Sequence, residues 1–125
     1  MIYRELLPEG CPPEDSMEIV ESLIVFRIVR TAPPTSEDFR SQRGEQPGRN
    51  FPGVSECQAC GLSVFTDRRD AEKALKLPNL RGRRICGIKL AEGAGRILQT
   101  GRPSHHTWWP LADLEILSYC ETEAA

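Results

Sequence analysis

The sequence predicts a single α+β domain, with about five strands in a mixed or antiparallel sheet and two short helices. Three observations support this class. The chain has 125 residues, which is the size of one domain. Residues 23–30 are a nearly continuous β-branched and apolar run. Residues 61–75 combine a short apolar strand pattern with a helix pattern. We divide the chain into an irregular N-terminal arm (1–21), the domain (22–120) and a tail (121–125).

The strongest predicted strand is Leu23-Ile-Val-Phe-Arg-Ile-Val-Arg30, whose apolar residues on both faces indicate a central position in the sheet. Arg27 shares a face with Val25 and Val29, whereas Arg30 lies on the opposite face at the strand end. A guanidinium in a buried strand needs a partner, because leaving it unpaired is strongly destabilising. Two interpretations stay open. Arg27 forms a structural ion pair with an acid from an end of the chain, or it points into a cleft to hold a phosphate or carboxylate.

A proline-containing break at residues 31–34 precedes a short helix that is expected to run from residue 35 or 36 to about Arg43. Thr35 and Asp38 have the spacing of a capping box, with the shorter acid in the second position. Residues 44–60 form a long loop. Loops of this length in a compact domain are usually functional or disordered.

A short strand that turns directly into a helix is the best-specified unit of the chain. Gly61-Leu-Ser-Val-Phe65 predicts a buried strand, and Thr66 is the expected N-cap, because its hydroxyl can accept from a free amide of the first turn. Pro78 stops the helix. The residues with the spacing of an apolar stripe against the sheet are Ala71, Ala74 and Leu75. This unit places Ser63 inside an otherwise apolar strand.

Three further strands are expected at 85–90, 96–99 and 114–119, separated by a turn at 91–95 and by the segment 104–110. The apolar and β-branched residues of these stretches support the assignment. No apolar run approaches the roughly 18 residues that a membrane span needs, and none has the form of a signal peptide. We therefore expect a cytoplasmic protein with no membrane association.

The five cysteines do not resemble a secreted disulfide framework, because their number is odd and their positions are scattered. Cys86 and Cys120 are most simply small buried apolar residues. Cys57-x-x-Cys60 is the only spacing typical of a metal site, and a zinc ion would need two further ligands from elsewhere in the chain. We expect plain loop cysteines in preference to a zinc or a redox site, and so no bound metal.

Charge is distributed unevenly along a chain whose net charge is −2. The two ends are acidic and residues 39–110 are basic, so the middle could meet a phosphate-bearing partner. Alternatively, the acidic ends fold back over the basic middle. A non-enzymatic partner-binding or immunity-type module is the second function hypothesis, and its contact residues would be Arg68, Arg69, Arg81, Arg83 and Arg84 with the loop 44–60. Nucleic acid is the less favoured partner, because few aromatic residues alternate with these arginines.

The densest cluster of reactive side chains is His105-His-Thr-Trp-Trp-Pro110. Two imidazoles beside two indoles could form a pocket wall that stacks a flat ring and moves a proton. Alternatively, Trp108 and Trp109 close the core and the histidines serve a loop. Because strand neighbours point to opposite faces, we expect His106 to share a face with Trp108, and His105 with Trp109.

These motifs carry a resemblance. Phe26-Arg-Ile-Val-Arg-Thr-Ala-Pro-Pro-Thr-Ser-Glu-Asp-Phe39, then Gly61-Leu-Ser-Val-Phe65 with its helix, then His105-His-Thr-Trp-Trp-Pro110, resemble a set of small bacterial proteins. Their order of motifs is similar to the ADP-ribosyltransferase superfamily, which includes the RES-type NAD-consuming toxins of toxin–antitoxin systems. The superfamily places an Arg or His on an early strand, a Ser or Tyr on a strand that enters a helix, and a catalytic residue, often Glu, before a late strand.

The resemblance implies an ADP-ribosyltransferase-like fold and a nucleotide ligand, NAD. Carried over residue by residue, it implies that Arg27 or Arg30 holds a phosphate or ribose and that Ser63 contacts the nicotinamide side. The third motif falls on His105 and His106, with Trp108 as the stacking aromatic of the cofactor site. No glutamate stands at that motif, since Glu115 lies inside the last predicted strand. The activities implied are those of an NAD-dependent transferase or an NAD glycohydrolase.

Overall fold

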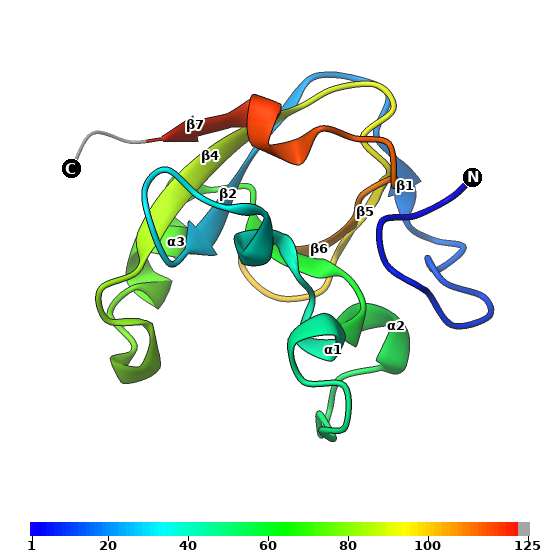
Figure 1. The fold of residues 1–125 in the computed structure, drawn as a ribbon, viewed down its shortest axis with the longest axis horizontal. Helices are drawn as coiled ribbons and strands as arrows, with labels where there is room; N and C mark the ends of the chain where they lie inside the picture. Colours follow the sequence, from blue (N-terminus) through cyan, green and yellow to red (C-terminus); the bar gives the residue numbers. More distant parts are fainter. Residues whose placement is uncertain (123–125) are drawn as a thin grey trace.

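The computed structural model describes residues 1–122, which form one α+β domain around a seven-stranded antiparallel sheet (Figure 1). Its order is β1-β5-β6-β3-β2-β4-β7. The strands are β1 (Met17–Glu18), β2 (Leu23–Val29), β3 (Leu62–Phe65), β4 (Arg84–Leu90), β5 (Arg96–Gln99), β6 (His105–Trp109) and β7 (Cys120–Thr122). The predicted class is confirmed, but the predicted number of strands is too low.

The structure differs from the predicted strands at both edges of the sheet, β1 and β7, and at β6, which lies in the segment 104–110. β1 falls within the N-terminal arm, where Met17 and Glu18 pair with β5. The strand expected at 114–119 is wrong, since this stretch contains a 3-10 turn, Ile116–Tyr119. The Ser118 hydroxyl donates to the Glu115 carbonyl oxygen at 2.7 Å, a local bond that favours a turn over an extended strand. The chain becomes extended only at Cys120. Of the predicted tail 121–125, the last three residues lie outside the described part of the chain.

Short helical segments connect the strands. They are α1 (Gln42–Glu45), α2 (Glu56–Ala59), α3 (Arg68–Ala74) and the 3-10 turns Ser36–Phe39, Pro78–Leu80 and Ile116–Tyr119. The helix predicted to run to Arg43 is split, because Arg40 is extended and Ser41 starts α1 as a new N-cap by accepting from Gly44 N at 3.0 Å. Thr35 and Asp38 form the predicted capping box, in which Asp38 Oδ2 accepts from Thr35 N at 2.9 Å.

The helix after β3 starts one residue later than expected. Asp67, not Thr66, is the N-cap of α3, and its carboxylate accepts from Arg69 N at 2.9 Å. Thr66 instead donates its own amide to the Ser104 carbonyl oxygen at 3.2 Å. Of the predicted apolar stripe, Ala71 is fully buried, whereas Ala74 and Leu75 are only partly buried. Within residues 1–122, no helix has the length and apolar character needed to cross a membrane.

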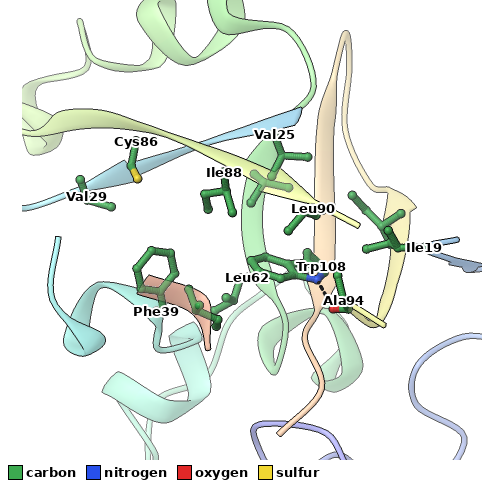
Figure 2. Close-up of a cluster of buried hydrophobic side chains, with 13 residues drawn as sticks. Ile19, Val25, Val29, Phe39, Leu62, Cys86, Ile88, Leu90, Ala94 and Trp108 are labelled. Carbon is green, nitrogen blue, oxygen red and sulfur yellow. Dashed lines mark hydrogen bonds between the residues drawn. The ribbon is translucent and has the colours of Figure 1, made fainter. Parts of the chain in front are cut away.

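The core lies on one face of the sheet, and the strand alternation determines which residues enter it (Figure 2). The turn residues Phe39 and Ile116 close this face against the strands. The strand residues of this core cluster are Val25, Val29, Leu62, Val64, Cys86, Ile88, Leu90, Ile97 and Trp108. Trp108 has no exposed surface, and its indole Nε1 donates to the Ala94 carbonyl oxygen at 2.8 Å. This bond satisfies the buried N–H, as a core tryptophan requires.

Between β2 and β3 the sheet is split. β2 pairs with β4 along seven residues, from Leu23 to Val29. It meets β3 at a single register position, Phe26 opposite Phe65. β3 in turn pairs with β6 at four positions. The two central strands therefore diverge from Phe26 onward, and their facing backbone groups need other partners.

Candidate functional site

The side chain of Arg27 fills the split. Its Nη1 donates to the carbonyl oxygen of Ser63 on β3 at 2.7 Å. Nε donates to the Asp38 carbonyl oxygen at 2.8 Å, and Nη2 to that of Arg40 at 3.2 Å. The guanidinium thus provides one bond across the split and two bonds that hold the 36–39 turn and the residue after it. The partners of Arg27 are backbone carbonyls, so the predicted ion pair with an acid from a chain end is not the arrangement found.

A cavity of about 180 Å³ opens at the split. The residues that line it come from β2 and the residue after it, the segment from the 36–39 turn to α1, α2, the start of β3 and the residue before β4. They are Arg27, Ile28, Arg30, Asp38, Arg40, Ser41, Gln42, Glu45, Gln58, Gly61, Ser63 and Arg83. Four arginines face two acidic residues, so the lining has an excess of positive charge. Such a concentration of guanidinium groups suits phosphate or carboxylate ligands.

The four arginines differ in how free they are. Burial lowers the pKa of Arg27 to about 10, because desolvation outweighs the carboxylates nearby, yet the group stays protonated at neutral pH. Arg30 Nη2 donates to Glu45 Oε1 at 2.6 Å. Arg40 has a half-exposed side chain and a loose contact of 3.9 Å with Glu37. Arg40 is therefore freer than Arg27 and Arg30 to turn towards a ligand.

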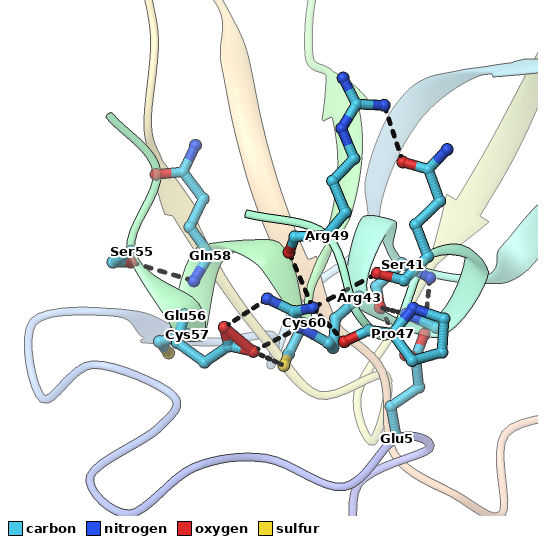
Figure 3. Close-up of polar contacts among 12 residues, drawn as sticks. Glu5, Ser41, Arg43, Pro47, Arg49, Ser55, Glu56, Cys57, Gln58 and Cys60 are labelled. Atoms are coloured by element: carbon cyan, nitrogen blue, oxygen red, sulfur yellow. Dashed lines mark hydrogen bonds and ion pairs between the residues drawn. The ribbon is translucent and has the colours of Figure 1, made fainter. Parts of the chain in front are cut away.

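The predicted loop 44–60 is ordered and forms one wall of this site (Figure 3). Arg43 lies at its centre: Nε and Nη2 donate to the Glu56 carboxylate at 2.7 and 2.9 Å. Its Nη1 donates to the Arg49 carbonyl oxygen at 3.0 Å. From the N-terminal arm, the Glu5 carboxylate accepts from Ser41 N at 2.7 Å. These bonds hold α1 and α2 beside the cavity.

Ser63 also connects the cavity to β6. Its hydroxyl lies 2.9 Å from Nε2 of His105. Nδ1 of His105 lies 2.9 Å from the Thr100 hydroxyl, which in turn lies 2.8 Å from the hydroxyl of Thr107. Desolvation by burial, followed by the neighbouring His106, lowers the pKa of His105. Hydrogen bonds thus hold the imidazole at both nitrogens. Because its pKa is lowered, the ring is neutral at neutral pH.

His106 and Trp108 do not join this group. His106 pairs with Val64, so it faces the side of the sheet on which Trp108 enters the core. Its Nδ1 donates to the Ser104 carbonyl oxygen at 2.8 Å. Trp108 is fully buried and cannot stack against a ligand in this arrangement. The structure thus places Arg27, Arg30 and Ser63 around one cavity, with His105 bound to the Ser63 hydroxyl, and it places His106 on the face of the sheet that holds Trp108.

The cysteines also differ from the expectation. Cys57 is not a plain loop cysteine, because it forms a disulfide with Cys11 of the N-terminal arm. Cys60 is free and buried, and burial raises its thiol pKa. Among residues 1–122, no three His, Cys, Asp or Glu side chains gather as they would around a metal ion. Cys86 is buried in the core as predicted.

The sequence did not point to two of these residues. Arg40 follows the capped turn, and only its position one residue after Phe39 could have placed it beside Arg27. Thr100 directly follows β5, and its hydroxyl reaches His105 because the short connection from residue 100 to 105 returns the chain antiparallel. Of the proposed basic contact residues, Arg69 pairs with Asp67 at 2.9 Å and Arg68 with Glu72 at 3.8 Å, whereas Arg83 lines the cavity.

Comparison of the chain with models of protein families, with curated proteins and with solved structures finds no match. The function is therefore inferred from the site itself.

Proposed function

We propose that the protein binds NAD, or a related nucleotide with a diphosphate group, at the split between β2 and β3. The observation that carries this proposal is the convergence of four arginines on one cavity beside the hydrogen-bonded pair Ser63 and His105. Guanidinium groups are planar and donate in pairs, which matches the oxygens of a diphosphate. The resemblance of the motifs to ADP-ribosyltransferases points to the same ligand.

The cavity holds only part of such a ligand. Its volume is about 180 Å³, whereas sites that enclose a drug-sized molecule measure about 300–1,000 Å³. We therefore assign the cavity to the diphosphate, and we place the bases along the surface outside it. Phe65 takes the stacking role once expected of Trp108, because its ring lies 5.5 Å from that of His105 on the same face of β3 and β6.

The arginines to be tested are Arg30 and Arg40. Replacing Arg27 would remove bonds to three backbone carbonyls, so loss of binding in that variant could reflect damage to the fold. Arg30→Gln and Arg40→Gln, the rim variants, change two side chains of the cavity lining that are about half exposed. A lost charged hydrogen bond is worth about 1.5–3 kcal/mol, so each variant should bind NAD about 10- to 100-fold more weakly. Arg69→Gln is the control, because this largely exposed side chain on α3 does not line the cavity.

Isothermal titration with NAD, ADP-ribose and inorganic pyrophosphate measures these affinities. Saturable binding of all three ligands, weakened at Arg30 and Arg40 but not at Arg69, supports a diphosphate site. Release of nicotinamide from bound NAD then becomes the assay for a transferase or glycohydrolase. The proposal fails if none of the three ligands gives heat at millimolar concentration, or if the rim variants bind as well as the unchanged protein. Capture of a protein partner through exposed Arg81 and Arg84 would then become the leading hypothesis.

A further inference from the structure

A hydrogen-bonded chain of four side chains ends at an exposed serine hydroxyl. It runs from the buried Thr107 through Thr100 to His105, and from His105 to Ser63, with successive distances of 2.8, 2.9 and 2.9 Å. Ser63 is exposed, whereas Thr107, which pairs with it across β3 and β6, is buried. A serine whose hydroxyl meets a histidine ring nitrogen, with the second nitrogen held by another group, has the arrangement of an activated nucleophile.

The bonding pattern can place the imidazole in the tautomer that a base requires. When Nδ1–H donates to the Thr100 oxygen, the Nε2 lone pair accepts the hydrogen of the Ser63 hydroxyl. Thr100 can then donate to Thr107. The ring is fixed further by its edge-on contact with Phe65, at 76° between the planes. Burial and His106 lower the pKa of His105, which keeps the ring in its basic form at neutral pH.

Ser63 also belongs to the lining of the arginine-rich cavity, and its carbonyl oxygen accepts from Arg27. Arg27 has five N–H donors, of which three bind backbone carbonyls. Arg40 is half exposed. Arg27 and Arg40 line the same cavity as Ser63, so their positive charge stabilises the negative charge that develops on a carbonyl or phosphoryl oxygen during attack. It also favours substrates that carry an anionic group next to the reacting centre.

We propose that Ser63 is a nucleophile with His105 as its general base, able to take up an acyl or phosphoryl group from an anionic substrate. In this step the Ser63 Oγ–carbon or Oγ–phosphorus bond forms, and the Oγ proton moves to His105 Nε2. The bond to the leaving group breaks with its electron pair, and the imidazolium returns the proton to that group. Water releases the product by the reverse proton path. The proposal does not rest on nucleotide binding.

Thr100 acts as a positioning residue, because it contacts His105 and not the reacting atoms. A hydroxyl stabilises an imidazolium less than the carboxylate of a Ser-His-Asp triad does. We therefore expect slow turnover, which makes a reactive probe more informative than a search for substrates. An alkyl fluorophosphonate is suitable: the Ser63 Oγ–phosphorus bond forms, fluoride leaves, and His105 takes the proton.

The experiment is labelling of the full chain at pH 7.5, followed by mass spectrometry of the intact protein and of its peptides. We expect one phosphonyl group per chain, on Ser63, and none in Ser63→Ala. His105→Gln should slow labelling at least about 100-fold, which is the contribution of a general base. Thr100→Val keeps the shape of the side chain and should slow labelling less. Ser118→Ala is the matched control, because Ser118 is an exposed serine outside the site.

Two results would overturn the proposal. One is a Ser63 that stays unlabelled while the protein is folded by circular dichroism. The other is labelling of Ser63 at the same rate in His105→Gln. If His105→Gln does not fold, Thr100→Val takes its place, together with the pH profile. The rate in the unchanged protein should fall on acidification as His105 gains its proton, and a rate independent of pH contradicts the base role. Loss of NAD binding with labelling intact separates this proposal from the nucleotide site.

Discussion

The guanidinium of Arg27 binds the carbonyl oxygen of Ser63 at 2.7 Å, and this contact crosses the split between two central strands. Two further carbonyls, those of Asp38 and Arg40, share the same side chain. A residue that the sequence marks as a ligand arginine thus also bridges the sheet. Its removal has consequences for folding that can be separated from those for binding.

Arg27→Met should lower the free energy of unfolding by about 3 kcal/mol, because three carbonyl oxygens lose a charged donor. The loss is not larger, because water can donate to part of these oxygens. Arg27→Lys should cost less, since an ammonium can reach one or two of the carbonyls but cannot form the planar fork. Urea unfolding followed by tryptophan fluorescence gives both values. Arg40→Met, at a half-exposed position, is the control and should change stability by less than about 0.5 kcal/mol. Equal effects at the two positions would contradict the bridging role.

Acidification should weaken the fold through His105. Its pKa lies below the ordinary value of 6.5, so the unfolded chain takes up a proton at a higher pH than the folded chain does. The contribution of this group is fully present above pH 6.5 and is lost progressively as the pH falls below that value. His105→Gln removes both the burial cost and the repulsion from His106. Between pH 7.5 and 5.5, urea unfolding should therefore show a smaller loss of stability in His105→Gln than in the unchanged protein. An equal loss in the two proteins would contradict the lowered pKa of His105.

Two glycines of the turn between β4 and β5 should respond differently to alanine. Gly93 has φ +88° and open space where a Cβ would be added. Gly93→Ala should therefore lower the free energy of unfolding only by the cost of a left-handed backbone at alanine, about 1–2 kcal/mol. Gly95 has φ +111°, and an added Cβ would lie 2.1 Å from the Trp109 carbonyl oxygen. Gly95→Ala should cost at least about 2 kcal/mol more, because backbone cannot move aside as a flexible side chain can. Thermal unfolding of the pair measures the difference.

The connection before β6 depends on Ser104. Its hydroxyl donates to the buried Asp70 carboxylate at 2.6 Å and accepts from Asp67 N at 3.1 Å, which ties the start of α3 to β6. Ser104→Ala leaves that carboxylate without this donor and should cost about 2 kcal/mol. Ser118→Ala removes a bond at the surface and serves as the control in the same urea titration. A cost at Ser104 no larger than at Ser118 would show that the bond is dispensable.

The Cys11–Cys57 disulfide should stabilise the protein by up to about 4 kcal/mol, since it closes a loop across 46 residues. The double variant Cys11→Ser, Cys57→Ser should lose this amount and become insensitive to dithiothreitol in urea unfolding. Thiol titration of the unreduced, denatured protein should find three free thiols, from Cys60, Cys86 and Cys120. Five free thiols would exclude the disulfide.

Local patterns in the sequence were sufficient for the elements that depend on neighbouring residues. The apolar run at 23–30 predicted β2, the capping spacing of Thr35 and Asp38 predicted the turn after it, and the pattern from Gly61 onward predicted β3 and α3. In each case the signal is a side-chain period or a cap within a few residues. The same local reasoning failed at 114–119, where a side-chain bond from Ser118 favours a turn.

The site required the tertiary structure. Ser63 and His105 are 42 positions apart, and they meet because β3 pairs with β6 in a register that sets Phe65 opposite His105. The same register places His106 and Trp108 on the opposite face. The alternation of strand residues predicted that these two side chains share a face, but not which face of the sheet it is. The two strand arginines were visible in the sequence. That the sheet would split beside Arg27 was not, because strand pairing depends on contacts between distant parts of the chain, and no local propensity encodes them.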